Sequence, residues 1–472
     1  MERGHRRPLR LPGSLAAIAL GVLASCHETQ APHAAAVRPR PLVLVAVDGL
    51  EWRLVLEMAG AARLPALQSL ISDGAFARLR TLAPALSPPI WTSIATGVVP
   101  QRHGVLGFVK PGLRDARSRP VPYSNRDRRV KAIWNVASDA GVSACVIGYW
   151  ATFPVEELAG VMVAQTGAPP AAAGERTRKG GLRAELDGQV HPPELAARVL
   201  DLARASGAQV ALREKELYGA SPQWPAAMQR LIEHSRWSLA ADTAYQDIAL
   251  ELAGGGDRCA LLIVYLGLPD VLGHRFWRWT FPGDFAAPPP AAEVARFGDV
   301  LRRAYQQIDG FVGEIRRRAG ANATVIVASD HGMGPWHPRS KVDVTRSEGP
   351  LLRTGGHSAA RDAFFAAAGP SVARQAARLP ARAASIAEAG SILDMTPTLL
   401  AMLGLARGAD MDGVVMTSLL DPAFVREHPL QEVPSHTPAD WQATRRLAGS
   451  AELPDPSAGE RIEQLRGLGY LQ

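Results

Sequence analysis

Residues 42–50 read LVLVAVDGL, an unbroken apolar run that ends on a carboxylate and a glycine. Similar apolar runs occupy residues 260–266, 323–329 and 363–368. Continuous runs of this kind, alternating with helical patterns, are typical of a parallel sheet that is covered on both faces. The sequence therefore predicts an α/β fold, with a doubly wound, mostly parallel central sheet, helices on both faces and an inserted cap region.

The composition excludes several other classes of protein. The chain has 472 residues, 47% hydrophobic and 21% charged, which is the profile of a globular protein. Three cysteines are too few for a disulfide scaffold of this length. Residues 1–25 carry four arginines and one glutamate, so the rest of the chain keeps only +4 of the net charge of +7. This small excess gives no reason to expect a nucleic-acid partner.

The first 40 residues have the features of an export signal and a tether. An arginine-rich start precedes nine apolar residues at 15–23, too few for a bilayer span of about 20 residues but suited to a signal peptide. Residues 23–26 resemble the bacterial lipobox, in which Cys26 would be lipidated; an ordinary secretory peptide is the alternative. His27, where Asp would favour retention at the inner membrane, implies an outer-membrane anchor facing the periplasm. We predict a signal peptide at 1–25 and a tether at 26–40.

The other two cysteines, Cys145 and Cys259, lie in apolar, strand-like runs. We expect buried free thiols there, although an exported protein could oxidise them.

Acidic and imidazole side chains follow three of the predicted strands. In open α/β sheets, ligands bind just outside the carboxyl ends of the strands. A single aspartate there is more often a helix cap or turn residue, but several aspartates and histidines together suit zinc or a similar divalent metal. A further histidine lies in a glycine-rich loop. The candidate ligands are Asp48, Asp270, His274, Asp330, His331 and His357.

Residues 84–97 contain a candidate nucleophile. Two prolines follow Ser87, and proline is tolerated in the first turn of a helix. This predicts Ser87 at the N-cap, with its hydroxyl at the positive end of the helix dipole. A structural cap would explain the segment by itself, but the same position would also stabilise a nucleophile and a bound phosphate.

With these segments in order, the chain resembles the alkaline phosphatase superfamily, and within it the type I phosphodiesterase/nucleotide pyrophosphatase family. The resemblance extends over roughly residues 41–420. Its motifs are VAVDGL at 45–50, SPPIWTSIATGVVPQRHG at 87–104, LPDVLGH at 268–274, ASDHGM at 328–333, GGH at 355–357 and DMTPTLLAMLG at 394–404.

The resemblance implies two divalent metal ions, usually zinc, and a covalent phospho-serine intermediate. One ion would be held by Asp48, Ser87, Asp330 and His331, and the other by Asp270, His274 and His357. The first ion would lower the pKa of the Ser87 hydroxyl, and the second would polarise the phosphoryl oxygens. We therefore expect a hydrolase of phosphoric esters, preferably diesters, acting on a small phosphate-ester or nucleotide-like substrate.

Thr92 competes with Ser87 for the role of nucleophile, because nucleotide pyrophosphatases use threonine. In the family the nucleophile lies nine residues before the threonine of a Thr-Gly pair and two residues before a proline. Counting back from Thr96 gives Ser87, and Pro89 stands at the required place. Thr92 would lie inside the helix, where a hydroxyl usually bonds back to a carbonyl of the preceding turn.

The sequence departs from its relatives close to the nucleophile. Ile90 and Trp91 stand where nucleotide pyrophosphatases carry Asn and His, and Trp91 replaces an arginine that sulfatases need. A sulfatase is therefore disfavoured. Asn125 is a candidate phosphate contact and Trp277 a candidate stacking residue; the alternatives are a plain turn and packing beneath a loop.

Three other functions stay open: a phosphotransferase that passes the phosphoryl group from Ser87 to an alcohol, a phosphomonoesterase, and a catalytically inactive, lipid-tethered binding protein. A complete ligand set argues against the last. The predicted catalytic domain spans 41–420, with a cap at about 165–240 that contains helices at 194–205 and 226–239. A tail at 421–472 ends in a short helix at 461–471.

Overall fold

The structure is a computed structural model of the chain. It describes residues 40–115, 118–165, 187–219, 226–253, 259–336, 353–357, 362–375, 379–448 and 462. The chain divides into two units, Met1–Arg38 and Pro39–Gln472. The first unit lies outside the described residues, and with it the predicted signal peptide, Cys26 and nearly all of the tether.

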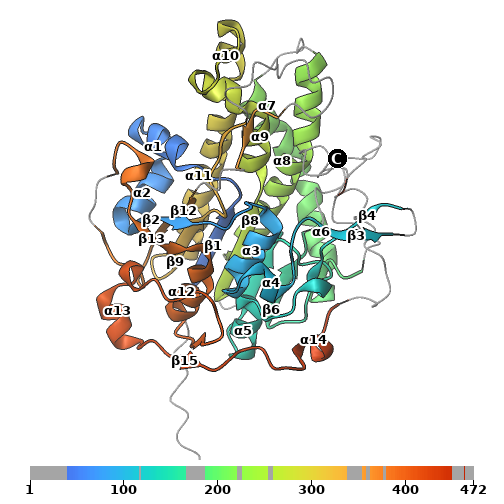
Figure 1. The fold of residues 1–472 in the computed structure, drawn as a ribbon, viewed down its shortest axis with the longest axis vertical. Coiled ribbons are helices and arrows are strands. Elements are labelled where there is room, and N and C mark those ends of the chain that lie inside the picture. Colours follow the sequence, from blue (N-terminus) through green and yellow to red (C-terminus); the bar gives the residue numbers. More distant parts are fainter. Residues whose placement is uncertain are drawn as a thin grey trace, which may run out of the picture. The chain divides into compact units, whose positions relative to one another are not determined.

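One mixed sheet forms the centre of the second unit, with nine strands among the described residues (Figure 1). Seven of them are parallel, whereas β12 and the edge strand β7 run antiparallel to their neighbours. This confirms the predicted α/β class. The strand order is β13 (Glu388–Ser391), β2 (Ala75–Arg80), β12 (Ala363–Ala368), β9 (Thr324–Ala328), β1 (Leu42–Val47), β8 (Leu261–Leu266), β5 (Ala144–Ile147), β6 (Gly160–Val163) and β7 (Val190–His191).

Side chains that alternate along β1 divide the core between two faces of the sheet. Val43, Val45 and Val47 pack with one group of helices, whereas Leu44 and Ala46 pack with another. Since successive side chains of a strand point to opposite faces, both faces are buried only if the run is apolar throughout. The first group includes α1 (Trp52–Gly60), α2 (Pro65–Asp73), α8 (Ala226–Ala253), α9 (Leu268–Thr280) and α11 (Val300–Ala319). The second is α3 (Ser87–Thr96), α5 (Ile133–Asp139) and α12 (Met395–Met402).

The predicted cap region lies partly outside the described residues, which omit 166–186 and 220–225. Its two predicted helices are present as α6 (Ala196–Ala205) and α8, and α7 (Gly207–Tyr218) lies between them. The second helix is longer than predicted, because α8 continues to Ala253. α6 and α7 pack against α8, and α8 packs on β8 and α9.

Short elements complete the unit. They are α4 (Pro100–His103), α10 (Ala291–Phe297), α13 (Pro422–Glu427), α14 (Trp441–Thr444) and the strand pairs β3 (Val109–Arg114) with β4 (Pro120–Pro122), β10 (Gly334–Pro335) with β11 (Gly355–Gly356) and β14 (Arg407–Gly408) with β15 (Glu432–Val433).

The predicted terminal helix at 461–471 lies outside the described residues except for Ile462, which is helical and buried. Within the described ranges no single helix has the length and apolarity to cross a bilayer. α1 and α2 together would pass that test, but the chain bends by 100° between them.

The prediction of two free thiols is wrong, because Cys145 and Cys259 form a disulfide. β5 and β8 are neighbouring parallel strands, and their register pairs Cys145 with Leu262. Cys259 lies just before β8, so the sheet brings the two sulfurs together across 114 residues of chain. The two cysteines can pair only because β5 and β8 are neighbours in the sheet. The number of cysteines gives no information about this strand order.

Candidate metal centre

The carboxyl ends of three adjacent strands bring the predicted ligands together. β1 lies between β8 and β9, and all three are parallel, so the segments that follow them start at one edge of the sheet. Asp48 comes directly after β1, Asp330 and His331 follow β9, and helix α9 after β8 carries Asp270 and His274. All five side chains are buried.

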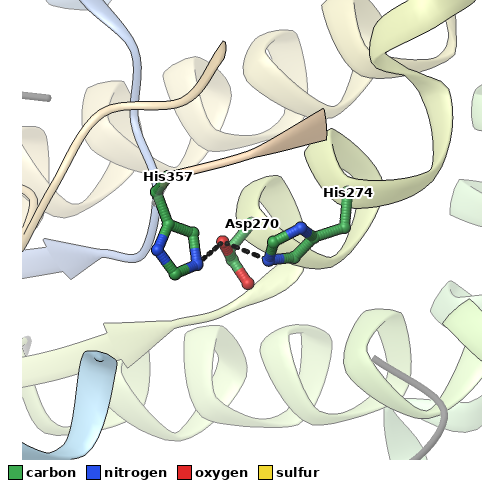
Figure 2. A group of neighbouring side chains, drawn as sticks. All are labelled: Asp270, His274 and His357. Carbon is green, nitrogen blue, oxygen red and sulfur yellow. Dashed lines mark ion pairs between the residues drawn. The ribbon is translucent and has the colours of Figure 1, made fainter. Parts of the chain in front are cut away.

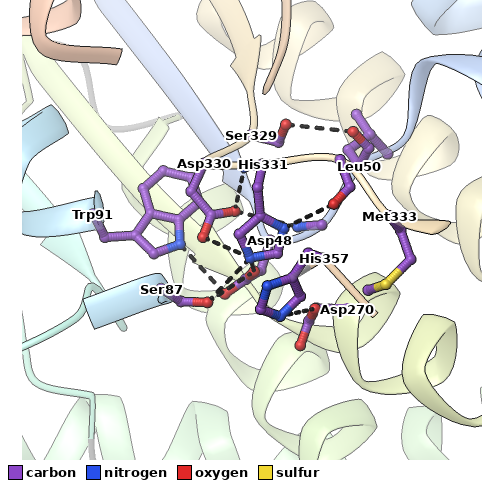
Figure 3. A network of polar contacts seen from close by, with 12 residues as sticks. Asp48, Leu50, Ser87, Trp91, Asp270, Ser329, Asp330, His331, Met333 and His357 are labelled. Carbon is purple, nitrogen blue, oxygen red and sulfur yellow. Dashed lines mark hydrogen bonds and ion pairs between the residues drawn. The ribbon is translucent and has the colours of Figure 1, made fainter. Parts of the chain in front are cut away.

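The first ligand group is Asp48, Asp330 and His331, whose ligand atoms lie within 4.8 Å of one another (Figure 3). His331 Nε2 is 3.5 Å from Asp48 Oδ1 and 3.2 Å from Asp330 Oδ2. Ser87 Oγ lies beside this group, 3.4 Å from Asp48 Oδ1 and 3.4 Å from His331 Nε2. The structure thus brings together the four residues predicted to share one ion.

The second ligand group is Asp270, His274 and His357 (Figure 2). The Nε2 atoms of His274 and His357 lie 3.4 Å and 3.8 Å from the same oxygen, Asp270 Oδ1. Asp270 and His274 are four residues apart in α9 and therefore share one face of the helix. The rings of His357 and His331 stack with their centroids 3.9 Å apart, so the two groups are neighbours.

Two glycines allow the ligand-bearing segments to approach this closely. Gly49 has φ +66°, and a Cβ atom there would lie 3.0 Å from the Cβ of Asp270. A Cβ atom at Gly355, in β11, would lie 2.2 Å from the carbonyl oxygen of Gly273 in α9. A larger residue at Gly355 would therefore push β11, and His357 with it, away from α9.

Ser87 was predicted to be the N-cap of this helix, but the N-cap in the structure is Leu86, and Ser87 is the first residue of α3. Its hydroxyl still lies at the positive end of the helix dipole. The Thr92 hydroxyl donates a hydrogen bond to the carbonyl of Pro88 at 2.7 Å, as expected for a hydroxyl inside a helix. Ser87, and not Thr92, thus lies against the ligand groups.

Two aromatic residues hold the other oxygen of Asp48. The hydroxyl of Tyr265 donates to Oδ2 at 2.5 Å, and the indole N–H of Trp91 donates to it at 3.3 Å. Trp91 lies four residues after Ser87, so the two side chains leave α3 on the same side. These contacts direct Asp48 Oδ1 towards Ser87. Sequence analysis missed both roles, although the four-residue spacing was a usable signal for Trp91.

The outer nitrogens of two histidines face carbonyl groups. Nδ1 of His274 is 2.9 Å from the oxygen of Gly355, and Nδ1 of His331 is 3.1 Å from the oxygen of Gly332. A proton on Nδ1 satisfies each carbonyl and leaves the Nε2 lone pair facing the carboxylates, the arrangement found around metal-bound histidines. Nδ1 of His274 also lies 3.3 Å from Nε of Arg353.

The electrostatics of the site also fit metal ions. Burial raises the pKa of the Asp270 and Asp330 carboxyls well above its usual value, and the charge of Asp48 raises it further. Burial lowers the pKa of His274 and His357, which keeps these imidazoles neutral. Neighbouring buried carboxylates repel one another unless a cation lies between them. Carboxylate oxygens and neutral imidazoles are ligands that zinc takes, so the residues present fit divalent ions.

Residues 42–377 match the sequence model of the type I phosphodiesterase / nucleotide pyrophosphatase family, and this range contains all seven predicted ligands. The chain belongs to this family. It is therefore a member of the alkaline phosphatase superfamily, as the motifs predicted.

Two solved structures are similar to this family member. One is phosphonoacetate hydrolase from Sinorhizobium meliloti 1021 in complex with phosphonoacetate, with 19% identity and a TM-score of 0.39; the match covers 65% of this chain and 59% of that hydrolase, less than two thirds of its length. The other is a 2-O GAG sulfatase, with 12% identity, a TM-score of 0.46 and coverage of 84% and 76%. No curated protein sequence matches this chain.

The two predicted substrate contacts of this family member have structural partners. Asn125 begins a 3₁₀ turn, and its side-chain nitrogen donates to the carbonyl of Pro154. Trp277 is 1% exposed, and its indole N–H donates to Asp284. Asn125 thus lies in a turn, and Trp277 is packed in the interior, which are the structural roles that the sequence left open for them. We therefore assign no substrate contact to either residue.

Proposed function

We propose that this chain is a two-metal phosphoric-ester hydrolase that forms a phospho-serine intermediate on Ser87. The observation that carries the proposal is the position of Ser87 Oγ, 3.4 Å from both Asp48 and His331 and next to two buried ligand groups. Family membership supports the choice of phosphoric esters as substrates.

The seven ligands fall into two sets in this proposal. Seven are too many for one zinc ion, which usually takes about four. When bound, the ions supply Lewis acidity, which lowers the pKa of the serine hydroxyl and offsets charge on the phosphoryl oxygens. One set is Asp48, Ser87, Asp330 and His331, and the other is Asp270, His274 and His357.

The chain's own residues then carry out two substitutions at phosphorus. Ser87 Oγ bonds to phosphorus while the ester bond to the leaving alkoxide breaks, and the proton of the serine hydroxyl ends on that alkoxide, which departs as the alcohol. Water next attacks the same phosphorus and the bond to Ser87 breaks; one proton of the water returns to Ser87 Oγ, and the phosphate product leaves. The positive end of α3 lies where negative charge gathers on the phosphoryl oxygens. Tyr265 and Trp91 keep Asp48 oriented throughout.

Turnover of two model esters tests the proposal. The purified protein is assayed with bis-p-nitrophenyl phosphate and p-nitrophenyl phosphate, after treatment with a chelator and again after addition of zinc. We expect zinc-dependent release of nitrophenol. Release should be faster from the diester, because the chain belongs to a family of phosphodiesterases. Faster monoester cleavage would indicate a phosphomonoesterase, and a requirement for an added alcohol would indicate a phosphotransferase. No turnover by zinc-loaded protein would leave a binding function.

We also propose that the protein is exported and anchored through a lipid on Cys26, in the outer membrane and facing the periplasm. The buried Cys145–Cys259 disulfide supports an oxidising compartment. Cys26→Ser is expected to move the protein from the membrane fraction to the soluble fraction, as followed by fractionation and palmitate labelling. If the wild-type protein is already soluble, the lipobox interpretation is wrong and simple secretion replaces it.

A further inference from the structure

Helix α9 supplies two ligands of the second group, and its amino end is held by a residue from another helix. α9 begins at Leu268, and its N-cap, Gly267, has no side chain that could accept the first backbone amides. Asp242 of α8 fills this role. Its Oδ1 accepts the N–H of Gly267 at 2.9 Å, and its Oδ2 accepts the N–H of Leu268 at 2.9 Å.

This contact fixes the part of α9 that bears the ligands. Asp270 is the third residue of the helix, two positions after Leu268, and His274 follows one turn later. At that next turn, the N–H of Thr354 donates to the carbonyl of His274 at 2.7 Å. The first two turns of α9 are therefore held at Leu268 by Asp242 and at His274 by the segment that leads to His357. A tilt at the first point would displace Asp270 Oδ1, which faces both histidines.

The negative charge of Asp242 also favours binding of a cation by Asp270. The amino end of a helix carries a partial charge of about +0.5, which disfavours a cation next to its first turn. Asp270 lies in that turn. Asp242 is 3% exposed, and this burial raises the pKa of its carboxyl to about 7. Above that pH its carboxylate offsets the helix charge with little screening by solvent.

We propose that Asp242 is a positioning residue for the second metal ion, which it serves by capping α9 from α8. It places Asp270 and His274 and thereby raises the affinity of the second ligand group. This inference rests on the proposed two-metal function.

The chain contains a matched control for this role. Asp309 of α11 is 4% exposed and accepts the backbone N–H groups of Ala66 at 3.1 Å and Leu67 at 2.7 Å, at the amino end of α2. It therefore makes the same kind of contact as Asp242, two hydrogen bonds from the first amides of a neighbouring helix, and is almost as little exposed. However, α2 carries none of the seven predicted ligands. Asp242→Asn and Asp309→Asn differ in the helix that loses its cap.

The experiment is a zinc titration of the full chain after removal of metal, with a competing indicator dye. We expect two equivalents of zinc in the wild-type protein. Asp242→Asn should bind one of them about 10–100-fold more weakly, the usual effect of losing a residue that orients ligands. Asp309→Asn should bind both zinc ions with wild-type affinity. Its thermal stability should fall, as should that of Asp242→Asn, because each variant weakens the cap of a helix.

The outcomes separate this inference from the proposed function. A wild-type protein that binds fewer than two zinc ions would overturn both. Two tight zinc sites in Asp242→Asn, or an equal loss in Asp309→Asn, would overturn the role of Asp242 alone. If Asp242→Asn does not fold, Asp242→Glu replaces it, because it keeps the charge but moves the carboxylate by one methylene group. It should show the same selective loss, and two wild-type affinities would contradict the inference.

Discussion

Ser87→Ala is expected to lower turnover by about 10³–10⁶-fold, the range seen when an enzyme loses its nucleophile. Alanine has no oxygen that could bond to phosphorus, so the covalent intermediate cannot form. The first ligand group would also lose the oxygen that lies 3.4 Å from both Asp48 and His331. Steady-state rates on bis-p-nitrophenyl phosphate measure the loss, and zinc content shows whether the site still fills.

Thr92→Ala is the matched control, because Thr92 lies in the same helix and is equally buried. Its hydroxyl bonds to the carbonyl of Pro88, so its removal should change turnover only modestly. Labelled substrate trapped on the wild-type enzyme should appear on the peptide that contains Ser87. Label on Thr92, or near-normal turnover by Ser87→Ala, would overturn the assignment.

The sequence predicted the fold best where patterns are local. The apolar runs at 42–47 and 363–368 coincide with β1 and β12, since a strand buried on both faces needs no alternation. It could not predict that β12 runs antiparallel to both neighbours, because direction depends on the path of the chain between strands. The predicted end of the helix from residue 226 was wrong by 14 residues, since the structure continues α8 to Ala253.

The ligand groups were predictable for a related reason. Parallel strands end at one edge of the sheet, so Asp48, Asp330 and the start of α9 had to lie near one another. The residues around the ligands were not predictable in this way. Tyr265 reaches Asp48 because the register pairs it with Ala46, and Asp242 reaches α9 because α8 packs beside it. Both contacts depend on tertiary packing between distant segments.

Loss of the Cys145–Cys259 disulfide is expected to lower the free energy of unfolding by about 4–5 kcal/mol. The bond closes a loop with a sequence separation of 114 residues, and in the chain-entropy model a loop of about 100 residues contributes about 4.7 kcal/mol by restricting the unfolded state. Both cysteines are buried in the core beneath α8, so reduction of the folded protein should be slow. The measurement is urea unfolding of the oxidised protein and of the Cys145→Ala/Cys259→Ala variant.

A reductant provides the control. Dithiothreitol present during unfolding should bring the wild-type protein close to the double variant and leave the double variant unchanged. Metal content should stay the same in the folded variant, because Cys145 and Cys259 lie at the starts of β5 and β8, whereas the ligand groups lie beyond the carboxyl ends of the strands. Equal urea midpoints, or alkylation of both thiols in protein isolated without reductant, would contradict the disulfide. Either result would also remove the structural support for export to an oxidising compartment.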